Sequence, residues 1–126
     1  MDQDYRKQIS QSFLNGMLKV IVLYQASVGP VYGGRLRNDL RAQGYEISPG
    51  SLYPLLHSLE QSDLLKSRLK VYKGRMRKYY EITVCGKTCL DEMRTQVGDI
   101  VREYSLKLRP RPKAPRQRIT KSFKTL

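Results

Sequence analysis

The side chains of this 126-residue chain that could do chemistry are mostly cations, and they gather in two places. Residues 66–78 hold seven Lys and Arg and no acid, and residues 109–126 hold seven more, again with no acid. The net charge is +13, so the rest of the chain is close to neutral. Such concentrated charge is typical of a surface that meets a polyanion, either nucleic acid or an anionic membrane. The alternative is a basic protein charged only for solubility.

Residues that catalysis or metal binding would need are scarce. His57 is the only histidine, and no nucleophile or orienting partner is spaced to work with it. Cys85 and Cys89 stand four residues apart, which favours packed thiols in a reducing compartment over a disulfide framework or a zinc site. The sequence therefore predicts a protein that is not an enzyme and that uses no metal or cofactor.

The stretch "ISPGSLYPLLHSLE", residues 47–60, predicts a helix with two different faces. Four leucines repeat at helical spacing on one side: Leu52, Leu55, Leu56 and Leu59. Polar and ring-bearing residues occupy the other side: Tyr53, Pro54, His57, Ser58 and Gln61. A helix that began at Ser48 would leave Pro54 without the N–H that should reach the Gly50 carbonyl. We therefore expect Ser51 to be the N-cap and Leu52 the first helical residue.

The exposed face of this helix is suited to a nucleic acid. Ser51 and Tyr53 lie near its start, where hydroxyl and backbone N–H groups meet phosphates, and His57, Ser58 and Gln61 could reach base edges. Two plainer interpretations stay open. Tyr53 could pack against a neighbouring hairpin, and His57 could be an ordinary solvated side chain.

The surrounding elements follow from periodicity and turn residues. Residues 10–27 predict a helix whose apolar face is Phe13, Leu14, Met17, Leu18, Ile21 and Val22. After the break at "SVGPVYGG", a second helix is expected to place Leu36 and Leu40 inward and Arg35, Arg37 and Arg41 outward, ending near Gly44. The runs "LLKSRLKVY" and "MRKYYEIT" predict a hairpin around residues 73–75, in which Arg77 and Tyr79 share one face and Lys78 and Tyr80 the other, with one tyrosine in the core.

A last helix is predicted from Val84 to Leu106, capped by Thr83. Five of its residues follow a heptad spacing: Leu90, Met93, Val97, Ile100 and Tyr104. This seam could pack on the chain's own first helix or on a second copy. The proline-rich basic segment 109–126 is expected to be mobile. The most apolar window, residues 13–29, is interrupted by polar residues and is unlike a membrane span, and the N-terminus is unlike a signal peptide.

The order helix, helix, helix, hairpin, long helix is that of a winged helix-turn-helix, a mostly α fold with a small β-hairpin, followed by a C-terminal dimerisation helix. The expected divisions are an N-terminal extension (1–9), a DNA-binding domain (10–83), a dimerisation helix (84–108) and a basic tail (109–126). The residues expected to contact DNA are Arg35, Ser51, Tyr53, Pro54, His57, Ser58, Lys73, Arg75, Arg77 and Lys78.

Two ordered motifs resemble the PadR family of bacterial transcriptional regulators. "GSLYPLLHSLEQSDLL" (50–65) is similar to that family's Ser/Thr-Leu-Tyr-Pro-Leu-Leu recognition helix, and "KGRMRKYYEITVCGK" (73–87) to its Gly-Arg and Arg-Lys-Tyr-Tyr wing. The segment "VYGGRLRNDL" (31–40) resembles the Tyr-Gly that opens its second helix.

The resemblance implies a homodimer that binds a pseudo-palindromic operator on double-stranded DNA, usually as a repressor, in the bacterial cytoplasm at the nucleoid. Some members of the family release DNA when a small aromatic effector enters the dimer interface. This chain contains no Trp, which some of those pockets use, and its basic tail is not a family feature. The alternatives are an architectural protein that coats nucleic acid through its wing and tail, and a protein-interaction adaptor.

Overall fold

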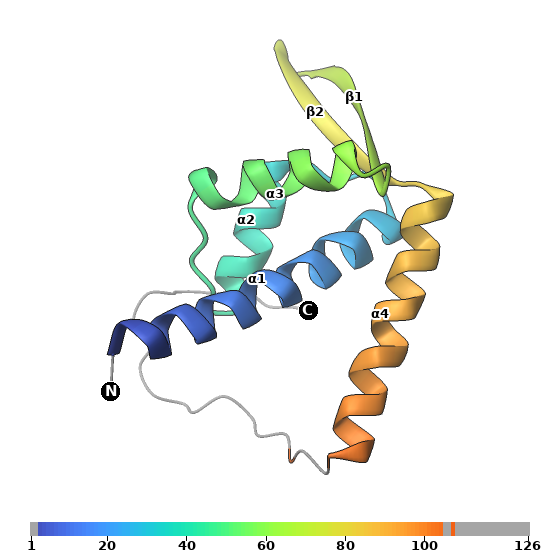
Figure 1. The fold of residues 1–126 in the computed structure, drawn as a ribbon. Coiled ribbons are helices and arrows are strands. Elements are labelled where there is room, and N and C mark those ends of the chain that lie inside the picture. Colours follow the sequence, from blue (N-terminus) through green and yellow to red (C-terminus); the bar gives the residue numbers. More distant parts are fainter. Residues whose placement is uncertain (1–2, 105–106, 108–126) are drawn as a thin grey trace.

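The computed structural model describes residues 3–104 and 107, which form four helices and one antiparallel hairpin (Figure 1). The elements follow one another in this order: α1 (Gln3–Val28), α2 (Gly33–Ala42), α3 (Pro49–Gln61), β1 (Leu65–Tyr72), β2 (Arg75–Ile82) and α4 (Val84–Glu103). Helices α2 and α3 form the helix-turn-helix pair and the hairpin projects beyond α3 (Figure 1). The predicted mostly α fold with a winged helix-turn-helix is confirmed.

Helix α1 is longer than its apolar pattern predicts, since it begins at Gln3 and not at residue 10. Only its second half is buried, through Leu18, Val22, Leu23 and Ala26. The prediction that Phe13 faces the core is wrong, because its side chain is 68% exposed. The first turns of α1 extend past α2 and α3 (Figure 1), and residues 3–10 are exposed.

Helices α2 and α3 both end in the same backbone motif. After α2, Gly44 has φ 94°, and the N–H groups of Gly44 and Tyr45 donate to the carbonyls of Arg41 and Leu40. After α3, Asp63 takes the corresponding left-handed conformation with φ 63°. These are Schellman caps, and they satisfy carbonyls that the helix end leaves without partners. The predicted role of Gly44 is confirmed.

Helix α3 begins earlier than expected, so the prediction that Ser51 is its N-cap is wrong. Ser48 is the N-cap, and its Oγ accepts a hydrogen bond of 3.2 Å from the Ser51 N–H. Pro49 occupies the first helical position, where a missing N–H costs nothing. Pro54 therefore lies inside the helix and cannot donate to the Gly50 carbonyl.

The hairpin turns through Lys73 and Gly74, with φ 51° and 77°. Two successive positive φ values match the twist of a two-residue hairpin turn. The register pairs Tyr72 with Arg75 and Leu65 with Ile82. The predicted hairpin is confirmed, as is the prediction that one tyrosine joins the core, since Tyr80 is 5% exposed.

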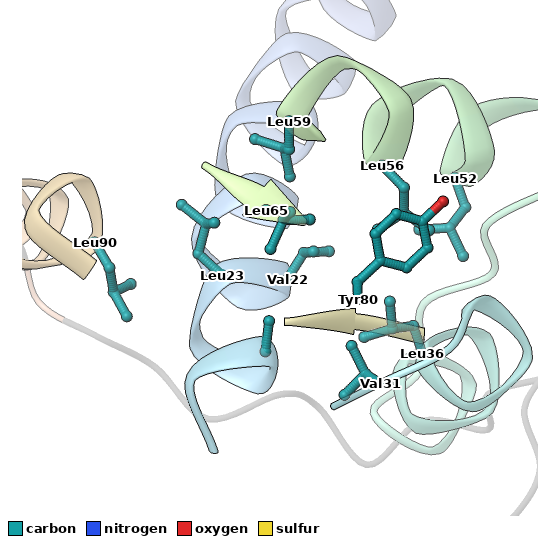
Figure 2. Close-up of a cluster of buried hydrophobic side chains, with 11 residues drawn as sticks. Val22, Leu23, Val31, Leu36, Leu52, Leu56, Leu59, Leu65, Tyr80 and Leu90 are labelled. Carbon is teal, nitrogen blue, oxygen red and sulfur yellow. The ribbon is translucent and has the colours of Figure 1, made fainter. Parts of the chain in front are cut away.

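The core gathers leucines from every helix around Tyr80 of the wing (Figure 2). Leu52, Leu56 and Leu59 of α3 are buried in it, as their spacing predicts, and Leu55 is half-buried. Val31 adds a short bridge to β2, exchanging backbone hydrogen bonds of 3.0 and 2.7 Å with Tyr80. This bridge fixes the start of α2 beside the wing.

The predicted heptad seam of α4 is buried at its start and exposed at its end. Leu90 lies in the chain's own core and Met93 packs against it, whereas Val97, Ile100 and Tyr104 are 39, 49 and 74% exposed. Thr83 caps the helix as predicted, because its Oγ1 accepts from the Gly86 N–H at 2.9 Å. The helix ends at Glu103; residues 105, 106 and 108–126, including the basic tail, lie outside the described residues.

Candidate nucleic-acid interface

A hollow of about 430 Å³ lies where the start of α2, the exposed side of α3 and strand β2 meet. Its wall is made by Tyr32, Gly33, Gly34, Tyr53, His57, Met76, Arg77, Lys78 and Tyr80. Four of the residues predicted to contact DNA, namely Tyr53, His57, Arg77 and Lys78, are therefore brought together although they come from two separate segments. Ser51, Pro54 and Ser58 are exposed on α3 outside this hollow.

Tyr53 is positioned by a close approach to α2. A Cβ added at Gly33 would lie 2.6 Å from the Tyr53 hydroxyl oxygen, so only glycine leaves room for the ring in this position. The ring is still 46% exposed, which leaves its hydroxyl able to donate to a ligand. Tyr53 thus packs against the start of α2 and also faces the hollow that it shares with β2.

Glu60 ties the wing to α3. Its Oε2 accepts hydrogen bonds from the Ser67 N–H at 3.2 Å and from the Ser67 Oγ at 2.6 Å. Its Oε1 lies 3.9 Å from the Lys78 Nζ on the other strand. One carboxylate therefore holds both strands, and it fixes the angle between the wing and the helix.

Arg77 lies among aromatic rings, and it pairs with Lys70 in the half of the hairpin nearer the turn. Its guanidinium carbon is 3.9 Å from the ring centre of Tyr32 and 4.4 Å from that of Tyr72, within cation–π range. Its Nη1 donates to the Tyr79 hydroxyl at 3.4 Å, and this hydrogen bond raises the pKa of Arg77. Tyr32 and Tyr79 themselves meet edge to face, with ring centres 5.5 Å apart. Arg77 is thus half-buried and links α2 to both strands.

The hairpin carries more positive charge than its neighbours neutralise. Arg68 pairs with Glu81 and Lys78 with Glu60. Among the residues that the structure describes, the other cations of the hairpin apart from Arg77 form no ion pair: Lys66, Lys70, Lys73 and Arg75. All four are exposed. The wing therefore presents uncompensated charge to any polyanion beside α3.

The arginines of α2 have partners within the chain. Arg35 lies 3.7 Å from Asp39, Arg41 lies 3.3 Å from Glu46, and the Arg37 Nε donates to the Ile47 carbonyl at 3.2 Å. The last contact holds the loop between α2 and α3. Arg35 remains exposed on the same helix, 60% by its side chain, and an exposed pair of this kind exchanges readily for a phosphate.

The burial of Tyr80 in the core should make the stability of the protein depend on pH. Burial raises the pKa of its phenol above the ordinary 10.0, outweighing the lowering by Lys78. The unfolded chain then loses this proton at a lower pH than the folded chain does. The free energy of unfolding should therefore fall as the pH rises above about 10. In Tyr80→Phe, urea unfolding between about pH 9 and pH 11 should show a shallower fall than in the unaltered protein; the same slope in both would contradict the prediction.

The part of the chain that the structure describes also bears on metal sites, disulfides and membrane spans. Residues 3–104 and 107 contain no group of three or more His, Cys, Asp or Glu placed to hold a metal ion. Cys85 is exposed and Cys89 half-buried, and both are free thiols. No helix within those residues is long and apolar enough to cross a membrane.

Comparison with known proteins decides the family. The model of the Transcriptional regulator PadR-like family matches residues 22–92, more than half of the chain. The chain belongs to the PadR-like family of transcriptional regulators. It is 37% identical over 93 residues to Transcriptional regulator Rv3488 of Mycobacterium tuberculosis, a match that covers 74% of this chain and 87% of that relative.

Solved structures of PadR-like proteins agree with this assignment. A PadR family transcriptional regulator from Eggerthella lenta has a TM-score of 0.68 at 31% identity, over 82% of this chain and 95% of that one. A PadR-like transcription factor from Bacteroides fragilis has a TM-score of 0.69 at 25% identity, over 78% and 96%. The resemblance found in the sequence is confirmed, and the family and these names point to a regulator and not to an enzyme.

The contacts of three residues in this PadR-like regulator's site could not be predicted from its sequence. Tyr32 stacks on Arg77, and Gly33 leaves room for the Tyr53 ring. Glu60 accepts a hydrogen bond from Ser67 of the wing. The Tyr-Gly pair contributes to the family resemblance and the Glu ends a leucine helix, but neither feature indicates which side chains these residues contact. Their roles arise from contacts between segments, which periodicity does not report.

Proposed function

We propose that this protein is a sequence-specific DNA-binding regulator that acts as a homodimer on a palindromic operator, as a repressor in the bacterial cytoplasm at the nucleoid. The observation that carries the proposal is the joint placement of the exposed face of α3 and the uncompensated wing. Helix α3 exposes hydroxyl, imidazole and phenol groups that could reach base edges in a major groove, and the wing beside it carries cations that could reach phosphates.

The proposed dimer uses apolar side chains that this chain leaves uncovered. Val97 and Ile100 of α4 and Tyr104 at its C-cap are exposed, toward the end of the helix that runs away from the body of the molecule (Figure 1). Tyr5, Ile9 and Phe13 are exposed on the overhanging start of α1. Pairing of these faces between two copies would bury both. A two-fold dimer on one face of DNA places its two α3 helices roughly 34 Å apart, one helical turn.

Selection of bound fragments from genomic DNA, followed by footprinting, tests the proposal. A palindromic footprint whose affinity falls steeply with salt is expected. Arg75→Ala should weaken binding to all sequences alike, whereas His57→Ala or Ser58→Ala should change which sequences are preferred. Equal affinity for the selected site and random DNA would overturn specific regulation. Loss of most binding on deletion of residues 109–126 would favour an architectural protein instead.

The dimer has its own test. Ile100→Glu should dissociate the protein into monomers in sedimentation and weaken operator binding, because a carboxylate would be buried against the partner helix. Glu103→Gln on the same helix is the matched control and should leave the dimer intact. A monomeric unaltered protein that still binds a full palindrome would contradict the dimer.

Gly33 offers a smaller and more specific prediction. Gly33→Ala should displace the Tyr53 ring, because the new Cβ would lie 2.6 Å from its hydroxyl oxygen. The ring end can rotate outward, so we expect a loss of stability within about 1 kcal/mol and a several-fold loss of operator affinity. The affinity loss should vanish when Gly33→Ala is made in a Tyr53→Ala background. An equal loss in both backgrounds would show that Gly33 acts by another route.

A further inference from the structure

The two faces of the hairpin differ in chemistry, and the difference follows from the register. The β1 residues Lys66, Arg68, Lys70 and Tyr72 pair with Glu81, Tyr79, Arg77 and Arg75 and form the basic face. The other face is apolar over most of its length. It pairs Leu65 with Ile82, Ser67 with Tyr80, Leu69 with Lys78 and Val71 with Met76.

The apolar face is buried only at its root. Leu65 and Tyr80 belong to the core, 1 and 5% exposed, but Leu69, Val71 and Met76 toward the tip are 61, 65 and 62% exposed. Three bulky apolar side chains on one short face are therefore left mostly uncovered by the described part of the chain. Contiguous exposed apolar surface of this kind marks a contact with a partner.

The apolar tip faces the same side as α3. Ser67 and Lys78, which lie next to it on this face, are both held by Glu60 of α3. Met76 itself lines the hollow that Tyr53 and His57 also line. The tip therefore continues the surface proposed to meet DNA and does not form a separate patch.

Cations lie at both ends of this apolar surface. Lys78 is paired with Leu69 on the same face, and Lys73 lies in the turn beyond Val71 and Met76. Arg75 follows that turn and projects from the basic face. No acid occurs in residues 66–78. A partner that fits must offer apolar surface with negative charge on either side of it. The minor groove of DNA does so, since its walls are the C–H edges of deoxyribose and its rims are phosphates.

We propose that Leu69, Val71 and Met76 pack against the sugar walls of the minor groove that flanks the site bound by α3, while Lys73 and Arg75 meet the phosphates. The inference rests on the proposed DNA binding and adds a source of specificity to it. A narrow A·T groove brings both walls against the apolar tip, and the guanine amino group would obstruct it. The wing thus selects A·T-rich flanks without reading a base edge by hydrogen bonds.

The double variant Val71→Thr/Met76→Gln tests the proposal, because it keeps side-chain size and removes apolar surface at two exposed positions. We expect operator affinity to fall on the order of tenfold with no change in the slope of log affinity against log salt. Arg75→Ala is the matched comparison and should reduce that slope by about one unit. Unchanged affinity in the double variant, or a reduced slope, would overturn the proposal.

The second part of the test varies the DNA that flanks the operator. Replacing A·T by G·C pairs in the flank should weaken binding of the unaltered protein, and replacing those G·C by inosine·C should restore it, because inosine lacks only the minor-groove amino group. The double variant should bind all three flanks alike. If a specific operator is found but its flanks have no effect on affinity, this inference alone is overturned. If no specific operator is found, the proposed function is overturned as well. Loss of a dimer or higher oligomer in the double variant would assign the apolar tip to a second copy instead.

Discussion

Changing Gly86 to Ala is expected to lower the free energy of unfolding by about 3 kcal/mol, the largest loss that a single added methyl group should cause in this protein. An ideal Cβ at this position would overlap the carbonyl oxygen of Leu64 and lie 2.6 Å from the Ile82 Cγ1. The backbone of Leu64 cannot move aside, because its carbonyl accepts from the Thr83 N–H at 3.1 Å and its N–H donates to the Leu59 carbonyl at 2.9 Å. The first turn of α4 would have to shift away from the root of the wing.

Urea unfolding of Gly86→Ala and of Gly98→Ala gives the measurement and its control. Gly98 lies in the same helix, is exposed, and has no atom within 4 Å of an added Cβ. That change should raise stability by up to about 1 kcal/mol, since Ala is the better helix former. Opposite signs for the two substitutions are the expected result. A Gly86→Ala protein as stable as the unaltered one would show that the packing of α4 against Leu64 is not close.

Local signals in the sequence predict much of this fold. Thr83 as a cap, Gly44 after α2 and Gly74 in the wing turn are each identified by residue type, because each meets a backbone requirement that few residues satisfy. The leucine spacing of α3 likewise predicts its buried face. These features depend on a few neighbouring residues, which is why a single sequence is sufficient for them.

Features that depend on distant segments could not be predicted in the same way. Strand alternation places Arg77 and Tyr79 on one face, but nothing in the wing indicates that Tyr32 packs against both. The expected DNA-binding role of Arg77 therefore gains a second part, which is to orient the wing on α2. Phe13 shows the converse. Its helical spacing is correct, but none of the segments in residues 3–104 buries it.

The start of α3 shows how two local rules compete. A cap at Ser51 avoids the hydrogen bond that Pro54 cannot make, worth about 1 kcal/mol. A cap at Ser48 gains the side-chain bond to Ser51, also worth about 1 kcal/mol, and places Pro49 at a favourable first position. Gly50 is exposed, so water can serve its carbonyl and reduce the cost of Pro54. The earlier start is therefore the more stable one.

Replacing Pro54 with Ala should raise the free energy of unfolding by about 1–2 kcal/mol, the largest stabilisation that we expect from a surface change here. The alanine would supply the missing N–H to the Gly50 carbonyl and remove the contact of the proline ring with that carbonyl. A more flexible unfolded chain offsets part of the gain. Pro49→Ala is the matched control: at the first helical position proline lacks no bond, so its loss should lower stability slightly.

Pro54→Ala is also expected to weaken operator binding several-fold. The exposed ring of Pro54 lies among the residues of α3 that are predicted to contact DNA: Ser51 and Tyr53 precede it, and His57 and Ser58 follow it. Affinity and urea stability should be measured on the same preparation at one salt concentration. A gain in stability with a loss of affinity would mean that the proline is retained for the surface it presents. A loss of stability in Pro54→Ala would instead mean that the ring packs within the folded chain, and that the cost assigned to its missing N–H is too high.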